Sequence, residues 1–211
     1  ELWDNLINGH SGIGMITQFD TLPFKTKIGG EIGPSEINQF LQRKGPRPFD
    51  RVIGYALYSM DEAIQDSQLD LKTVDHQRAG IVIGSSKGPF ATISEVNRIL
   101  ARGEHIDNYH LSDCCHGSIP TTIAIKYGLQ GVNHLVSSTS ASSAHAIGLA
   151  FEKIKYGLQD IVVCGGAENP VLPEIFAMDE SPKMLSQRND EPEKACRPFD
   201  NERDGIVISD G

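Results

Sequence analysis

The stretch from 133 to 166 constrains the fold of this chain more than any other part. Its apolar run NHLVSS is followed by SAHAIGLAFEKIKYG, which has helical spacing, and then by a second apolar run, DIVVCGG. Two strands joined by a whole helix run parallel, because antiparallel neighbours need only a short turn. The sequence therefore predicts that strands 133–139 and 160–166 are buried in one parallel sheet, with helix 141–157 packed against it.

Strands and helices also alternate in the rest of the chain. The pattern predicts a helix capped by Asp50, a buried strand over 79–84, a helix over 89–101 and a helix over 120–127. Such alternation indicates an α/β protein. One large domain or two small ones fit in 211 residues.

The two ends of the chain carry less regular patterns. ELWDNLIN is helix-like, and residues 9–48 are rich in turn residues, which predicts loops with short strands. Residues 168–203 predict a long irregular excursion, and loops of that length are usually functional. The last apolar run, GIVIS, predicts a final strand. Because the chain opens without Met and ends beside this strand, we expect it to be part of a longer protein.

Composition excludes several classes of partner. The net charge of −9 argues against a nucleic-acid backbone or an anionic membrane as a non-specific partner. No apolar run reaches the roughly 18 residues of a membrane span, and no signal peptide is visible. The four cysteines form no CxxC pair and show no metal-ligand spacing with histidine. We therefore expect reduced thiols, no metal, and a cytoplasmic protein.

The first candidate for chemistry is GSSKG at 84–88. It fits G-x-S-x-G between a strand and a helix, which is the context of a hydrolase nucleophile elbow with Ser86 as nucleophile. The alternative is a glycine-rich turn whose serines cap the following helix. The turn could also hold a phosphate at the helix N-terminus, although it lacks the P-loop pattern.

The second candidate is Ser140, at the join between strand and helix. The positive end of a helix dipole favours a thiolate there and offers amides to an oxyanion. A serine hydroxyl needs a base instead. His145 follows five residues on, about 7.5 Å along and about 140° around a helix, and so faces elsewhere. The alternative interpretation of Ser140 is an N-cap.

Five segments together resemble the β-ketoacyl-acyl carrier protein synthases of the thiolase-like superfamily. They are ELWDNLINGHSGIGMITQFD, RAGIVIGSSKG, IAIKYGLQG with the HAIG that follows it, KYGLQDIVVCGGAE, and SQRNDEPEKACRPFDNERDGIVISDG. Their order resembles the N-terminal half of an elongating type II synthase. The resemblance implies a thiolase-like α-β-α layered fold over 1–211, with a mostly parallel sheet. It also implies that the first strand and the C-terminal half lie outside this sequence.

The resemblance assigns roles to particular residues. Ser140 stands where the family has its nucleophilic cysteine, five residues before the histidine of HAIG. Cys115 stands where the family has a residue that gates the acyl pocket, so it is expected to line the substrate site. GSSKG becomes a structural turn. The implied reaction is decarboxylative Claisen condensation on carrier-protein thioesters, without a cofactor. The implied partners are acyl carrier protein and a second ketosynthase subunit, in a homodimer or heterodimer.

Serine at position 140 leaves several hypotheses open. It can be an engineered replacement in an otherwise active enzyme. It can also be natural, in a non-condensing partner like a chain-length factor or in a decarboxylase-like protein. The Ser86 hydrolase is a third hypothesis, from another reaction class.

Overall fold

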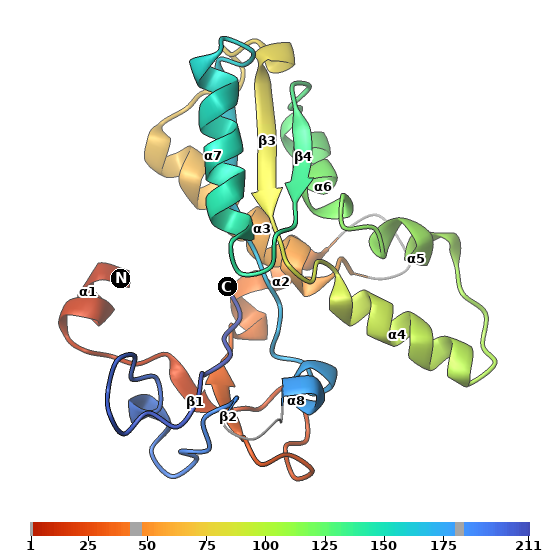
Figure 1. The fold of residues 1–211 in the computed structure, drawn as a ribbon. Coiled ribbons are helices and arrows are strands. Elements are labelled where there is room, and N and C mark those ends of the chain that lie inside the picture. The colour runs from red at the N-terminus through yellow and green to blue at the C-terminus, as the bar shows by residue number, and fades with distance from the viewer. Residues whose placement is uncertain (1, 43–47, 180–183) are drawn as a thin grey trace. The chain divides into compact units, whose positions relative to one another are not determined.

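The computed structural model describes residues 2–42, 48–179 and 184–211 and divides into two compact units (Figure 1). One unit holds residues 1–33 and 170–210, and the other holds residues 34–169 with Gly211. The second unit contains the β-α-β stretch and Ser140, and the first contains the two end segments of the chain.

A three-stranded parallel sheet forms the centre of the second unit. Its strands are β3 (Ala79–Gly84), β4 (Asn133–Val136) and β5 (Ile161–Gly166), in the order β4-β3-β5. Both outer strands run parallel to β3. This confirms the prediction that 133–139 and 160–166 belong to one parallel sheet.

The burial of these strands differs from the prediction. Every residue of β3 is buried, whereas Asn133 and His134 of β4 are exposed and most of β5 is half-buried. The physical reason is position, because β3 has a neighbour on each side and the other two are edge strands of the described sheet. The predicted burial is therefore correct for 79–84 and wrong for much of the other two strands.

Helices cover both faces of the sheet (Figure 1). On one face lies α7 (Ser142–Lys155), whose Ala146 and Ala150 pack against Val82 of β3. On the other face lie α3 (Arg51–Ser67) and α6 (Ser118–Tyr127), which contact each other. This arrangement is the α-β-α layering expected from the sequence.

Helix ends in the second unit follow the sequence signals. Asp50 caps α3, because its carboxylate accepts the Val52 N–H at 3.1 Å. The same carboxylate accepts the N–H and the hydroxyl of Thr92, in α4 (Phe90–Ala101), at 2.9 and 2.8 Å. Burial raises the pKa of Asp50 above its ordinary value. Helix α6 ends at Tyr127, as predicted, and its C-cap Gly128 has a φ of 71°.

Two short helices of this unit were not predicted. They are α2 (Pro34–Leu41) and α5 (Asn108–Asp113), and a single 3-10 turn, η1 (His76–Arg78), precedes β3. Short helices show little periodicity and depend on tertiary contacts, such as those that α2 makes with α3. The expectation of only loops and strands over 9–48 is therefore wrong at α2, and residues 43–47 lie outside the described chain.

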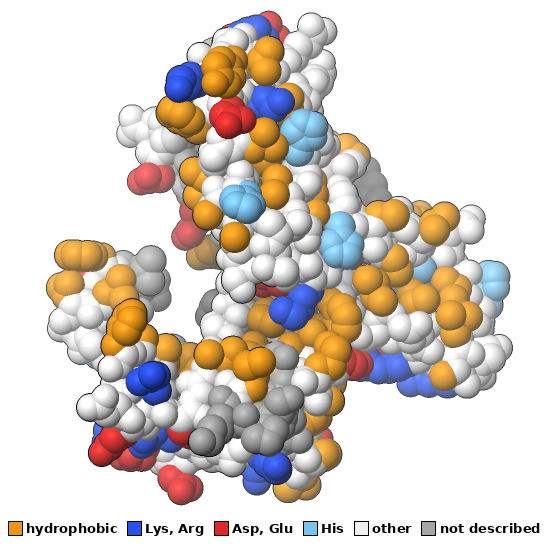
Figure 2. All heavy atoms as spheres, in the orientation of Figure 1, with side chains coloured by type: hydrophobic (Ala, Val, Ile, Leu, Met, Phe, Trp, Pro, Cys, Tyr) orange, Lys and Arg blue, Asp and Glu red, His pale blue; other side chains and the backbone are white. Residues whose placement is uncertain are grey.

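Helix α7 also has an apolar face that the second unit does not cover. Ile147, Phe151 and Ile154 are 53%, 64% and 42% exposed, and hydrophobic side chains gather over this helix in Figure 2. The face next to them, about a quarter turn around the helix, packs on the sheet through Ala146 and Ala150. The helix therefore has apolar side chains on two faces, of which the described residues bury one.

The first unit is built from short elements. These are α1 (Leu2–Ile7), β1 (Ile13–Met15), β2 (Ile28–Gly30), α8 (Pro173–Asp179) and the 3-10 turn η2 (Pro192–Lys194). Strands β1 and β2 pair antiparallel. Phe19 and Phe24 pack edge-on against Phe176, so the two ends of the chain share one aromatic cluster. The predicted N-terminal helix and short strands are confirmed.

The excursion over 168–203 is bonded to the N-terminal segment. The amide side chain of Asn189 donates to the Lys25 carbonyl at 2.8 Å and accepts the Lys27 N–H at 2.9 Å. The predicted final strand is wrong, because GIVIS makes only isolated bridges, from Ile206 to Leu185 and from Ser209 to Gly30. Its two partners lie in different segments, so no continuous ladder forms. Residues 180–183 lie outside the described chain.

Candidate active site at the Ser140 corner

Three loops meet at the carboxyl-terminal edge of the parallel sheet. The GSSKG turn follows β3, the segment 137–141 follows β4, and Glu168 follows β5. The Ser137 hydroxyl lies 3.4 Å from the Ser86 carbonyl, to which it donates. In open α/β sheets this edge is where ligands usually bind.

The chain turns sharply between β4 and α7. Thr139 has a φ of 51°, in the left-handed region that a β-branched residue rarely adopts. Ser142, at the start of α7, stabilises the turn. Its hydroxyl accepts the Ser138 N–H at 2.9 Å and donates to the Thr139 carbonyl at 2.6 Å, and its own N–H donates to the same carbonyl at 3.1 Å.

Ser140 lies at the outside of this turn. It is exposed, and its hydroxyl makes no hydrogen bond with the residues that the structure describes. The N-cap of α7 is Ala141, so the interpretation of Ser140 as an N-cap is wrong. The side chain of residue 140 is therefore available to a ligand at the positive end of a 14-residue helix.

His145 hydrogen-bonds to a different serine of the same corner. Its Nδ1 lies 2.7 Å from the hydroxyl of Ser138, and the described residues show no hydrogen bond between His145 and Ser140. Helical spacing between residues 140 and 145 applies only if both lie in the helix, and α7 begins at Ser142. Because the left-handed Thr139 turns the chain before the helix starts, Ser138 comes within reach of the first turn of α7 instead.

Two glycines allow the start of α7 to touch the sheet. A Cβ atom on Gly84 would lie 2.4 Å from the carbonyl carbon and oxygen of Ser142, and a Cβ on Gly166 would meet the Ser143 side chain. Real carbon atoms do not approach so closely, so both positions need glycine. The start of α7 therefore packs closely on both strands, with its backbone against β3 and with the Ser143 side chain against β5.

Glu168 holds the GSSKG turn from the end of β5. Its carboxylate accepts the Ser86 N–H at 2.6 Å, the Lys87 N–H at 3.1 Å and the hydroxyl of Ser85. An oxyanion hole in a nucleophile elbow would need the N–H of the residue after the serine, which here is Lys87. The turn therefore binds a protein carboxylate with the groups that a hydrolase would use.

Replacing Ser86 by alanine is expected to leave ester hydrolysis at background. The described residues place no histidine in a hydrogen bond with the Ser86 hydroxyl, so this serine lacks the base that an elbow nucleophile needs. Hydrolysis of p-nitrophenyl esters by the two proteins checks this. A fluorophosphonate label mapped to Ser86 by peptide mass spectrometry would contradict it.

Two cysteines of this unit, Cys115 and Cys164, are not nucleophiles of this corner. Cys115, between α5 and α6, is exposed, and its thiol donates to the Leu111 carbonyl at 3.3 Å. Cys164 lies within β5, and burial raises the pKa of its thiol, which disfavours the reactive thiolate. The ring of His116 packs against Gly88, where a Cβ would lie 2.5 Å from its Cδ2 atom. No local sequence pattern predicts that contact.

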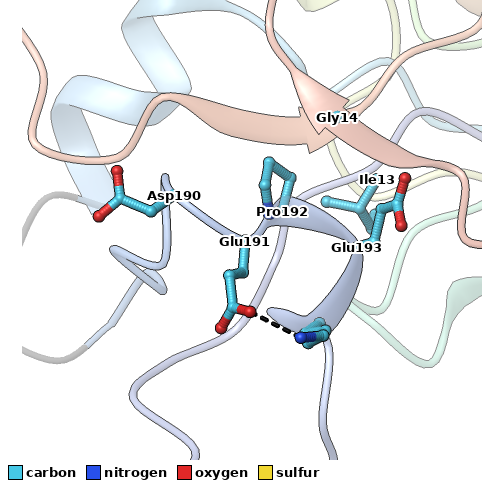
Figure 3. A pocket seen from close by; sticks show the side chains of 7 residues that line it. Ile13, Gly14, Asp190, Glu191, Pro192 and Glu193 are labelled. Carbon is cyan, nitrogen blue, oxygen red and sulfur yellow. Dashed lines mark hydrogen bonds and ion pairs between the residues drawn. The ribbon is translucent and has the colours of Figure 1, made fainter.

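The first unit has a hollow of its own beside β1. Figure 3 shows Asp190, Glu191 and Glu193 around Pro192, close to Gly14. Glu191 is paired with Lys194 at 2.6 Å, which lowers the pKa of its carboxyl.

Within the described ranges, no group of three or more His, Cys, Asp or Glu side chains could hold a metal ion. Within the same ranges, no helix is long and apolar enough to cross a membrane.

Comparison with known proteins gives a consistent result. A family model described as beta-ketoacyl synthase, N-terminal domain, matches residues 1–211. The chain is 33% identical over 220 residues to 3-oxoacyl-acyl-carrier-protein synthase 2 of Synechocystis sp.. It is 34% identical over 211 residues to the protein of the same name from Vibrio cholerae. These alignments cover 100% and 99% of this chain and 51% of each relative, so the chain spans about half the length of these relatives.

The fold matches solved ketosynthases. One of them is a type II polyketide ketosynthase bound to a hexaketide and in complex with its acyl-carrier protein. It superposes with a TM-score of 0.83 at 29% identity, over 100% of this chain and 51% of that one. The α-β-α layering around β4-β3-β5 is therefore the thiolase-like arrangement of ketosynthases. Because the family model matches this chain over residues 1–211, the chain belongs to the beta-ketoacyl synthase family, as an N-terminal domain of that family.

Proposed function

We propose that this chain is the nucleophile-bearing part of a 3-oxoacyl-acyl-carrier-protein synthase. The observation that carries the proposal is the family match over all of residues 1–211, which includes the corner at Ser140. The reaction is an acyl transfer followed by a decarboxylative Claisen condensation. An acyl group moves from a carrier thiol to the enzyme nucleophile, malonyl-carrier protein loses CO2, and the resulting carbanion attacks the acyl group and releases the nucleophile.

We propose that Ser140 stands at the nucleophile position and that serine there prevents efficient condensation. In support, Ser140 is exposed at the positive end of α7, as a nucleophile must be. The imidazole of His145, in the first turn of α7, is hydrogen-bonded to Ser138. A hydroxyl without a base stays protonated at neutral pH. Cys115 is proposed to line the acyl pocket.

Acyl carrier protein is the proposed partner and substrate carrier. The structural relative with a hexaketide was solved with its own acyl-carrier protein, which supports a carrier-protein partner for this chain as well. The reaction needs no cofactor, because the thioester and the malonyl carboxylate supply the chemistry. We also propose that the protein is cytoplasmic, because the four free cysteines of this chain would stay reduced there.

Decarboxylation tests this function apart from condensation. The complete protein is incubated with malonyl-carrier protein, and acetyl-carrier protein is measured by mass spectrometry. Acetyl-carrier protein above the level formed without enzyme supports the proposal, since the malonyl half-reaction does not need the nucleophile. Malonyl-carrier protein that stays intact, with a protein shown to be folded, contradicts it.

We expect the complete protein to be a dimer, either with itself or with a second ketosynthase-type subunit. Strand β4, which leads to Ser140, is an edge strand with exposed Asn133 and His134. An unpaired strand edge is a surface on which a second chain can add a strand. Light scattering at micromolar concentration checks the mass. The dimer is contradicted if the protein has the mass of a monomer both by itself and when mixed with a second ketosynthase-type subunit.

The second candidate is a non-condensing partner of an active ketosynthase. It is favoured by the same observation that limits Ser140, namely the lack of a base at its hydroxyl. This candidate and the engineered-variant hypothesis predict different effects of Ser140→Cys on acylation. A natural non-condensing subunit is not expected to regain acylation when only residue 140 is changed.

A further inference from the structure

We propose that His145 is a positioning residue, which holds Ser138 and thereby fixes the turn that presents residue 140 for reaction. The proposal rests on the proposed function, because it treats residue 140 as the nucleophile position. It assigns to His145 an indirect role that helical spacing from Ser140 did not suggest. The contact that carries it is the 2.7 Å hydrogen bond between the Ser138 hydroxyl and His145 Nδ1.

The turn at Thr139 requires such support. Threonine with a φ of 51° is strained, because its branched Cβ crowds the backbone in the left-handed region. Strained backbone of this kind persists only where the surrounding contacts determine it, and it is common at functional sites. The direction of residue 140 follows directly from the dihedral angles of residue 139.

Backbone groups on both sides of Thr139 are held by the start of α7. Ser142 binds the Ser138 N–H and the Thr139 carbonyl, and the Ala141 N–H donates to the Ser138 carbonyl at 3.2 Å. None of these contacts involves the Ser138 side chain. His145 binds that side chain from farther along α7, and it is the group that ties the last residue before the strained turn to the body of the helix.

His145 has no other described function in this corner. It is exposed, and the bond to Ser138 is the one hydrogen bond that its ring makes within the described residues. If the bond is lost, the Ser138 side chain is freed and the Thr139 turn loses one of its restraints. Residue 140 then moves farther from the N-terminus of α7, and the effect of the helix dipole falls off within about one turn. A thiolate at residue 140 would lose part of its stabilisation.

Thiol reactivity reports this effect without any carrier protein. In the complete protein carrying Ser140→Cys, the rate of alkylation by iodoacetamide is measured against pH, and peptide mapping separates the introduced thiol from the native cysteines. Adding His145→Ala is expected to slow alkylation at neutral pH about two- to fivefold and to move the profile to higher pH. The melting temperature is measured in parallel.

Matched variants separate positioning from general damage. His145→Asn puts a polar atom close to the place of Nδ1 and is expected to restore the profile, whereas His145→Gln extends farther and is not. His105→Ala removes another exposed histidine, which is bonded to none of the corner residues, and is expected to change nothing. Ser138→Ala is expected to match His145→Ala, and the double variant to add nothing further, because both remove the same hydrogen bond.

Two results would overturn the proposal. One is a lower melting temperature for His145→Ala with an unchanged alkylation profile, since that is a structural role alone. The other is additive effects of Ser138→Ala and His145→Ala. Alkylation does not depend on malonyl decarboxylation. A protein that fails to decarboxylate but shows the His145-dependent profile therefore contradicts the proposed function and supports this inference.

Discussion

Ser140→Cys in the complete protein is expected to create covalent acylation where the serine form shows none above background. The native cysteines are present in both proteins, so a mass gain specific to the variant reports residue 140. Intact mass spectrometry after incubation with acyl-carrier protein measures the gain, and peptide mapping locates it. The expected increase in rate is about a hundredfold or more, the range that a hydroxyl loses without a general base.

The physical reason is the difference between a thiol and a hydroxyl at the same place. A thiol ionises near pH 8.5 in water, and the positive end of α7 lowers that value, so a useful fraction of thiolate exists at neutral pH. The same helix end cannot ionise a hydroxyl. The Ser138–His145 hydrogen bond leaves Ser140 without a described base.

Ser140→Ala is the matched control, and it is expected to behave like the serine form. If the serine form already acylates at a rate comparable to the cysteine variant, residue 140 is a working serine nucleophile and this account is wrong. If the cysteine variant of the complete, folded protein stays unmodified, the inactive-partner hypothesis is supported and the engineered-variant hypothesis is contradicted.

Gly84→Ala is expected to cost about 3 kcal/mol of unfolding free energy, the upper end of the usual range for overpacking. The added methyl would lie 2.4 Å from the Ser142 carbonyl group and 2.6 Å from the Ser143 nitrogen. These are backbone atoms at the start of α7, so they cannot move aside as a flexible side chain can. Either α7 shifts away from β3 or the protein loses stability.

Urea unfolding of the complete protein measures this cost. Gly148→Ala is the matched control, because Gly148 lies inside α7 and a Cβ there meets nothing within 4 Å. It is expected to stabilise the protein by about 0.5–1 kcal/mol through helix propensity. A Gly84→Ala protein within about 0.5 kcal/mol of the original would show that the helix start is not held against β3.

What the sequence could predict depended on local patterns. The β-α-β unit was found because its strands and helix are each long enough to show a period, and the Asp50 cap because it directly precedes an apolar repeat. The position of Ser140 between strand and helix followed from the same boundaries. The family role of Ser140 came from the order of several segments and not from its own surroundings.

The rest of the site depends on contacts that no local pattern encodes. Glu168 meets the GSSKG turn although more than 80 positions separate them, so the turn resembled a hydrolase elbow when read alone. Thr139 is a poor residue for a left-handed turn, so nothing at 139 indicated that the chain would reverse before α7. Without that turn, the bond between Ser138 and His145 could not be predicted.

The order of strands has a consequence for how the protein is made. Strand β3 is synthesised before both of its neighbours, because β4 and β5 begin only at Asn133 and Ile161. Parallel pairing over such separations is slow, because a long loop must close before the contacts form. The corner at Ser140 is backed by Gly84 and Gly166, from β3 and β5. During translation it therefore stays incomplete until β5 has left the ribosome, and until then at least one edge of the apolar strand β3 is unpaired and open to chaperones.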